Sequence, residues 1–100
     1  PLNEIQLQYR IMSEIQKIYK VKIDDTPAEL EFTENSMLCT TGDTVHFEVQ
    51  LDGKELRSYQ FQKPNKIALN IHVDSKLKFV RLTSKFAVDI SETIASLVKQ

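Results

Sequence analysis

The hydrophobic positions near the start of the chain follow a helical period. They fall on the alternating three- and four-residue spacing of a heptad seam, with polar residues at the outer positions. The seam contains Leu2, Ile5, Tyr9, Met12 and Tyr19, with Gln16 at the remaining position, and a second apolar line contains Ile11, Ile15 and Ile18. This spacing predicts a helix over residues 2–19, which either packs on its own domain or forms the last turns of a coiled coil.

The two apolar lines predict two different contacts. We expect Leu2, Ile5, Tyr9 and Met12 to form the interface with a partner subunit, because an exposed stripe of this kind is rare on soluble monomers. The second line is expected to lean toward the sheet of its own domain. Because the chain opens with Pro1 inside this pattern, we expect it to be cut from a longer coiled coil. The expected division is residues 1–18 as the coiled-coil end and residues 19–100 as a globular domain.

Beyond Tyr19 the period of the apolar residues changes from helical to alternating. Residues 19–23 alternate apolar side chains with lysines, and residues 28–32 alternate apolar side chains with glutamates, so each segment predicts a half-buried strand. Two aspartates and a proline at 24–27 indicate a turn between them. The expected cross-strand pairs place Lys20 and Lys22 opposite Glu29 and Glu31.

The middle of the chain contains a strong hairpin signal. Residues 35–43 are expected to be a loop, and residues 45–51 alternate strictly. Asp52-Gly53 is a favoured type I′ turn pair, and a two-residue turn there places Val49 opposite Leu56. It also places Glu48 opposite Arg57. Tyr59 and Phe61 then fall on the other face, which predicts a bulge near Arg57-Ser58 or a strand covered on both faces.

The last third of the chain contains one segment that is ambiguous and one that is clear. Residues 62–66 are expected to connect two elements, and residues 67–73 alternate like a strand but also place two isoleucines on one helix face. A helix could begin near Asp74, with a helical spacing of apolar residues from Phe79 onward, or near Ser84. Either reading predicts a helix over residues 85–98.

These elements predict an α+β domain. An N-terminal helix leads into a small antiparallel meander sheet, and the C-terminal helix packs on the apolar face of that sheet.

Composition and charge exclude several classes of function. One hundred residues correspond to one domain, and the net charge is −1, with Lys and Glu interleaved along the chain. A direct contact with nucleic acid is therefore not expected. The sequence has no apolar run long enough to span a membrane, and no membrane contact is expected. A single cysteine, Cys39, fits a reducing compartment.

Candidate catalytic residues are few and scattered. His46 and His72 each lie between apolar strand residues and lack the spacing of a metal site, so solvent-facing histidines are expected. Cys39 has no base near it in the sequence and is expected to be an inert, partly buried thiol. The paired Asp24-Asp25 lies in a turn, where such residues cap backbone groups. We expect no enzyme activity, no metal and no cofactor.

The order of coiled-coil end, small antiparallel sheet and C-terminal helix resembles the RWD-type globular heads of kinetochore proteins. The likeness is greatest to the spindle pole component twenty-five type, from the outer-kinetochore rod complex. It covers nearly the whole chain and rests on the spacing in four segments: residues 14–23, 28–35, 45–61 and 73–90. Residues 67–73 depart from it, because they alternate like a strand where the family would have irregular or short helical structure.

The resemblance implies a non-enzymatic scaffold subunit in the nucleus, at the centromere and kinetochore. Such a head pairs with a sister RWD subunit through the coiled coil, as a heterodimer, and docks on a centromere-side adaptor protein to support chromosome segregation in mitosis. The charges beside the seam do not distinguish a homodimer from a heterodimer. The alternative is a polo-box-like or pleckstrin-like module that binds a peptide or a lipid. Such modules also end in a helix but need six or seven strands.

Overall fold

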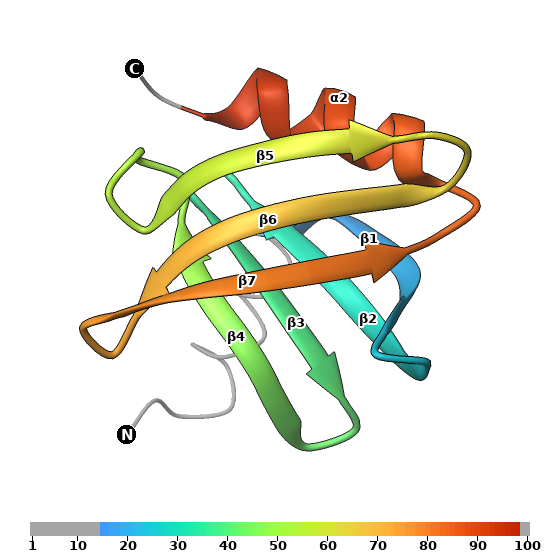
Figure 1. The fold of residues 1–100 in the computed structure, drawn as a ribbon, viewed down its shortest axis with the longest axis horizontal. Coiled ribbons are helices and arrows are strands. Elements are labelled where there is room, and N and C mark those ends of the chain that lie inside the picture. Colours follow the sequence, from blue (N-terminus) through green and yellow to red (C-terminus); the bar gives the residue numbers. More distant parts are fainter. Residues whose placement is uncertain (1–14, 99–100) are drawn as a thin grey trace.

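Two antiparallel meanders that join into one sheet, together with a helix, make up residues 15–98, which the computed structural model describes (Figure 1). The elements are β1 (Ile15–Ile23), β2 (Thr26–Thr33), β3 (Ser36–Thr41), β4 (Thr44–Gln50), β5 (Leu56–Gln62), β6 (Lys66–Val73), β7 (Lys76–Thr83) and α2 (Ala87–Leu97). The seven strands form one sheet in the order β4-β3-β2-β1-β7-β6-β5. Among the residues that the structure describes, both ends of this sheet are open edges, because β4 and β5 do not pair with each other.

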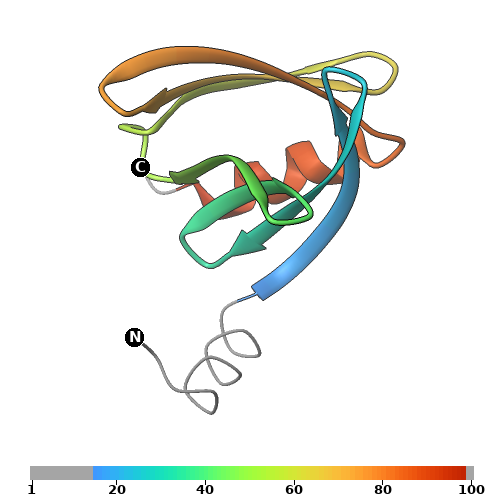
Figure 2. The ribbon, with the colours of Figure 1, turned by 90° about the horizontal axis from the view of Figure 1, so that it is seen from below.

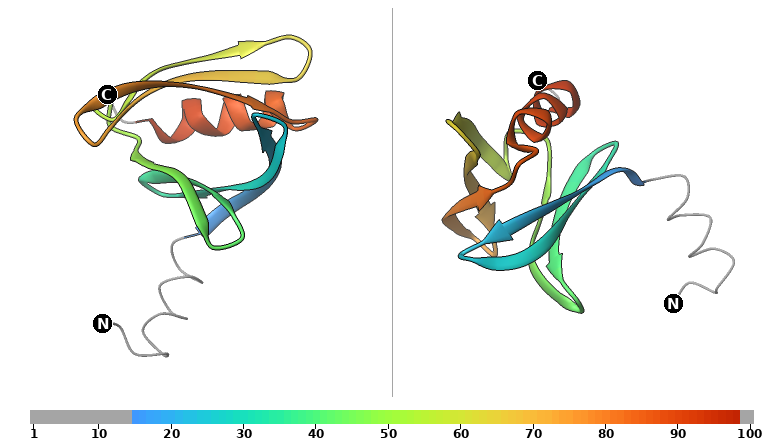
Figure 3. Two further views of the ribbon diagram at one scale, coloured as in Figure 1. Left: turned by 60° about the horizontal axis from the view of Figure 1, so that its bottom comes forward. Right: turned by 90° about the vertical axis from the view of Figure 1, so that its right-hand side faces the viewer.

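The sheet bends into two arms. Strands β1–β4 form the first arm and β5–β7 form the second, and within residues 15–98 the strands of the two arms pair only at Lys22 opposite Thr83 and Ile23 opposite Leu82. Seen end-on, the arms form a V, and α2 lies across its open side (Figure 3, right). Figure 2 shows the same arrangement from below, with the second arm above the first. The bend therefore gives the sheet an inside that α2 closes.

The core fills the space between the two arms and the helix. Each strand contributes alternate residues, because successive side chains of a strand point to opposite faces. Leu30, Phe32 and Met37 of the first arm are completely buried, as are Leu69 and Ile71 of the second. Helix α2 adds its own apolar face, formed by Ala87, Ile90 and Ile94.

Two of the hairpins are closed by tight turns with left-handed backbone. Asp24 and Asp25 have φ of 49° and 65°, and Asp74 and Ser75 have φ of 53° and 64°. Two-residue hairpin turns of the type I′ class need positive φ at both positions, which short polar residues tolerate better than most. The turn expected at residues 24–27 is therefore present, although Thr26 and Pro27 already belong to β2.

The predicted fold class is wrong. Residues 15–98 form a seven-stranded antiparallel sheet with a C-terminal helix, and not the small meander sheet of an α+β RWD-type head; the part of the expected N-terminal helix before Ile15 lies outside the described residues. The helix predicted over residues 2–19 fails in its last part, because β1 begins at Ile15. Ile18 is half exposed and does not lean toward the core. Strand pairing with β2 overrides the helical spacing in this segment.

The predicted hairpin across Asp52-Gly53 is also wrong. Val49 lies opposite Met37, and Leu56 lies opposite Ile71. The segment between β4 and β5 passes from one arm to the other instead of reversing direction, and its first residue, Leu51, is buried and donates its N–H to the Asn35 carbonyl. Strands β4 and β5 therefore lie at opposite edges of the sheet, and the pair expected between Glu48 and Arg57 does not form.

Two further segments differ from expectation. Residues 35–43, expected to be a loop, contain β3, in which Met37 and Cys39 are buried between polar neighbours. Residues 76–83 form β7, and the helix begins at Ala87, closer to the second of the two predicted starts. The apolar residues of β7 also fit a helical spacing, which is why the sequence alone did not separate the alternatives.

Other predictions are confirmed. The strands at residues 19–23 and 28–32 form with the expected alternation. Of the expected cross-strand charge pairs, Lys20 lies opposite Glu29, but Lys22 lies opposite Pro27 and Glu31 lies opposite Ile18. The bulge near Arg57-Ser58 is present as a register shift against β6. The ambiguous residues 67–73 are strand, within β6. The C-terminal helix covers the apolar side of the sheet, as expected.

Candidate functional site

The fold brings three of the candidate residues, His46, Asp24 and Asp25, to the lining of one cavity, whereas Cys39 and His72 lie away from it. His72 is exposed on β6, whereas His46 on β4 is only partly exposed, and its Nε2 lies 2.7 Å from the Thr41 hydroxyl. Cys39 is completely buried, and burial raises the pKa of its thiol to about 11. Asp24 and Asp25 occupy a tight turn. Among residues 15–98 there is no cluster of side chains that could hold a metal ion.

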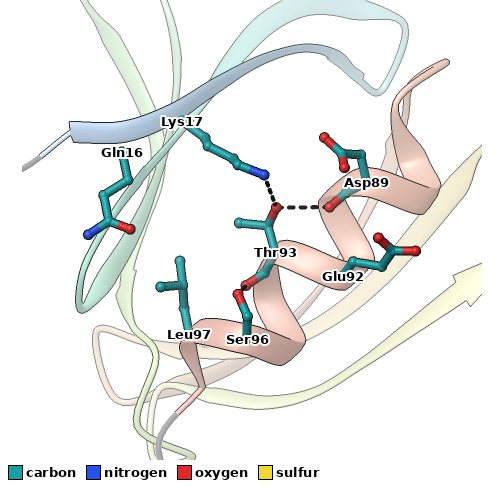
Figure 4. Close-up of a pocket in the computed structure, with 7 residues that line it drawn as sticks. All are labelled: Gln16, Lys17, Asp89, Glu92, Thr93, Ser96 and Leu97. Atoms are coloured by element: carbon teal, nitrogen blue, oxygen red, sulfur yellow. Dashed lines mark hydrogen bonds between the residues drawn. The ribbon is translucent and has the colours of Figure 1, made fainter.

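A polar cavity of about 240 Å³ lies between β1 and α2 (Figure 4). The polar side chains around this cavity form a hydrogen-bonded network. Lys17 Nζ donates to the Thr93 hydroxyl over 3.4 Å, and the Tyr19 hydroxyl donates to Asp89 Oδ2 over 2.7 Å. The two hydroxyl oxygens, of Tyr19 and Thr93, are 2.9 Å apart. Hydrogen bonding to Tyr19, followed by the charges of Tyr19 and Asp89, raises the pKa of Lys17. The network fastens α2 to β1, which is a structural role.

Charge divides the domain in the same way as the bend does. Residues 15–55, which include the first arm, contain nine acidic and four basic residues, whereas residues 56–85, which include the second arm, contain one acidic and seven basic residues. The basic residues of the second arm are all exposed: Arg57, Lys63, Lys66, Lys76, Lys78, Arg81 and Lys85. The expectation that Lys and Glu are interleaved along the chain is therefore wrong for residues 56–85. A running count of charge along the sequence would have shown this basic segment.

Strand β7 forms the most unusual surface of the second arm, which we call the basic arm. Its first four residues, Lys76 to Phe79, are all exposed, so this end of the strand is open to solvent on both faces. Leu77 and Phe79 are 66% and 56% exposed, which is high for large apolar side chains on a strand. The guanidinium of Arg81 lies 5.4 Å from the centre of the Phe79 ring. Cations and an accessible aromatic ring are thus combined on one strand.

A cavity of about 440 Å³ adjoins this strand. It lies where β7 separates from the β1–β2 turn and from the beginning of β4. Lys78, Phe79 and Arg81 line the β7 side, and Asp24 and Asp25 line the opposite side together with His46 of β4. The cavity is therefore bounded by basic and aromatic groups on one wall and by carboxylates on the other.

The predicted partner-subunit residues Leu2, Ile5, Tyr9 and Met12 lie outside the described residues, and that interface stays a prediction. None of the described helices is long and apolar enough to cross a membrane. Neither a comparison with protein-family models nor one with curated protein sequences found a match to this chain.

Proposed function

We propose that the domain is a non-enzymatic interaction module whose basic arm binds an acidic segment of a protein partner. The proposal follows the pleckstrin-like or polo-box-like alternative, because the seven strands and the C-terminal helix supply the elements that this class requires. The single observation that carries it is the separation of charge between the arms, together with the exposed apolar residues of β7.

The charge pattern favours a protein ligand over a lipid surface. An anionic bilayer would attract the second arm, but the turns nearest to β7 contain Asp24, Asp25 and Asp74, which it would repel. A protein segment can place its carboxylates on the lysines and leave the aspartates free. Such complementarity chiefly determines which partner is chosen and how fast it is captured.

The same pattern disfavours nucleic acid. A polyphosphate strand needs a continuous basic track, with aromatic side chains on which bases can stack. On the outer face of β7, Phe79 is the one exposed aromatic residue among those described. The acidic first arm begins on the other side of the cavity.

A place at the outer kinetochore stays an untested prediction. The expected RWD fold, on which it depended, is wrong, and no feature of residues 15–98 favours a centromere-side adaptor over another acidic partner. A scaffold role without catalysis is compatible with either assignment.

The test compares three ligand classes on the purified domain. Immobilised peptide libraries of equal length, one rich in Asp and Glu and one rich in Lys and Arg, are screened beside phosphatidylserine vesicles and single-stranded RNA. We expect acidic peptides to bind, and their affinity to fall as salt is raised from about 0.05 to 0.5 M.

Charge reversal on the two arms gives the matched control. Lys76→Glu with Lys78→Glu should weaken acidic peptides about tenfold or more, because two favourable pairs become repulsive. Lys54→Glu, on an exposed loop of the first arm, should leave binding unchanged. Stronger binding to vesicles or RNA than to any acidic peptide would contradict the proposal, as would equal effects of the two charge reversals.

A further inference from the structure

β7 has an open edge within the sheet. β6 pairs with the whole of β7 on one side, whereas within residues 15–98 β1 pairs on the other side only at Leu82 and Thr83. A continued β1 would run alongside the rest of β7, but the chain turns away at Asp24 and Asp25. The stretch Lys76–Arg81 is therefore an unpaired edge, where alternate residues direct their backbone N–H and C=O outward.

The space beside this edge is not filled by side chains. The cavity of about 440 Å³ lies against Phe79, Val80 and Arg81, and its far wall is the β1–β2 turn. Neighbouring strands need a separation of about 4.8 Å, so an added strand would take the position that β1 leaves vacant.

We infer that an extended acidic segment of a partner protein adds as a further strand to the edge Lys76–Arg81. This inference rests on the proposed function and specifies its site. Main-chain hydrogen bonds supply affinity in this mode of binding, and alternate side chains supply specificity. Acidic residues of the segment lie beside Lys76 and Lys78, and apolar residues lie beside Leu77 and Phe79, which are otherwise exposed to water.

The charges set the arrangement of the segment along the groove. Lys76 and Lys78 lie toward the β6–β7 turn, whereas Asp24 and Asp25 border the cavity near the β1–β7 junction. The acidic positions of the segment therefore lie at the Lys76 end, and the positions near Asp24 are uncharged or basic. A uniformly acidic segment fits this groove less well than one with acidic residues at one end.

The two outer edges of the sheet are poorer candidates for the same ligand. β4 belongs to the acidic arm, and the backbone N–H of Gln50 at its end is already bound by the Glu55 carboxylate over 3.0 Å. β5 is interrupted at Arg57 by a register shift. The edge of β7 combines an uninterrupted register with basic side chains.

Lysines on an exposed strand edge also have a protective role, because they discourage pairing between copies of a protein. A second copy that placed its acidic β4 on the β7 edge would form an open chain of molecules. The experiment therefore distinguishes three cases: an edge that the lysines keep unpaired, an edge that pairs with a second copy, and an edge that captures a partner segment.

The experiment uses two fluorescent probes of identical charge. One is a peptide of four Glu-Val repeats followed by a short Ser-Gly tail, and the other has the same sequence with alternate backbone nitrogens methylated. We expect the first to bind and to slow hydrogen exchange at amides of Lys76–Arg81 that exchange fast in the free domain. Methylation removes the backbone donors and should weaken binding at least tenfold, as measured by fluorescence anisotropy.

Side-chain variants provide the matched comparison. Phe79→Ser should weaken the unmethylated probe severalfold, whereas Val45→Ser, which alters an apolar residue of similar exposure on the first arm, should not. Equal binding of the methylated probe would overturn strand addition and leave the proposed function standing. Failure of every acidic library peptide to bind would overturn the proposed function itself. Protection of the β7 amides that rises with domain concentration, without probe, would assign the edge to a second copy and overturn the inference.

Discussion

Replacing Tyr19 by Phe removes the hydroxyl that joins β1 to α2 and leaves the ring in place. The hydroxyl lies 2.7 Å from Asp89 Oδ2 and 2.9 Å from Thr93 Oγ1. The ring centroid lies 5.9 Å from that of Phe32 and 6.0 Å from that of Phe86, and both contacts survive the substitution. The variant therefore separates the hydrogen bonds of the helix attachment from its packing.

The size of the effect follows from the partners of the hydroxyl. A hydrogen bond to a charged group contributes about 1.5–3 kcal/mol to folding. Asp89 is exposed, so water solvates its carboxylate in the variant and lowers the loss to about 1–2 kcal/mol. Thr93 keeps its bond to the Asp89 carbonyl, at 2.9 Å. In a domain of this size such a loss lowers Tm by about 5–12 °C.

The assay is urea unfolding followed by circular dichroism, with Tyr59→Phe as the control. Tyr59 is a partly buried tyrosine on β5 that takes no part in this network. A double-mutant cycle of Tyr19→Phe with Asp89→Ala should give a coupling of about 1 kcal/mol at an unchanged m-value. A loss below about 0.3 kcal/mol, or an equal loss at Tyr59, would refute the attachment of α2 through this hydroxyl.

Three further outcomes follow from burial and charge. Because burial raises the pKa of Cys39 to about 11, iodoacetamide at about pH 8 should modify it only as fast as the domain unfolds; rapid modification of folded protein would contradict this. Leu30→Ala, at a fully buried position, should lower the free energy of unfolding by about 2–5 kcal/mol, whereas Leu77→Ala should lower it by less than about 0.5 kcal/mol. Similar urea midpoints for the two variants would argue against the assigned faces of the sheet. Backbone hydrogen bonds, the one from Glu55 foremost, lower the pKa of Asp52, so its stabilisation is present above the unfolded pKa of about 3.9 and is lost as pH falls through the lower folded pKa. Urea midpoints in acid should therefore fall less steeply for Asp52→Ala, and parallel curves would exclude this role.

The sequence predicted the strands whose apolar residues alternate without competition. Residues 19–23 and 28–32 have one apolar and one charged face, which only a half-buried strand satisfies. It also predicted α2, because residues 87–97 have apolar side chains at helical spacing and no alternation. An element that is buried on one side has apolar residues at a regular period in its sequence, and these segments show that period clearly.

Strands β3 and β7 were missed, and β6 was left ambiguous; in β6 and β7 two periods fit the same residues. In β7, exposed Phe79 beside buried Val80 and Leu82 imitates a helical spacing. The Asp52-Gly53 pair has the residues of a hairpin turn, but Asp52 instead accepts hydrogen bonds from the backbone N–H groups of Lys54 and Glu55. Pairing between distant strands determines such segments, and local pattern does not contain that information.

The candidate site depended on information of a different kind. The charge difference between the arms is present in the sequence, but it acquires meaning only when residues 56–85 are known to form one arm of a bent sheet. The open edge of β7 cannot be read from the sequence, because it results from the early departure of β1 at Asp24. The exposure of Phe79 likewise emerged only with the register of β7.

The narrow junction between the arms has a consequence for the order of folding. Within each arm the strands pair with their neighbours in sequence, so their contacts close short loops and are expected to form early. Joining the arms requires Ile23 to meet Leu82 and Tyr19 to meet Asp89, which is 70 residues away in the chain. These contacts are expected to form after the transition state. Stopped-flow measurements on Tyr19→Phe should then show faster unfolding at an almost unchanged folding rate, so the lifetime of the folded domain depends on how firmly α2 closes the V.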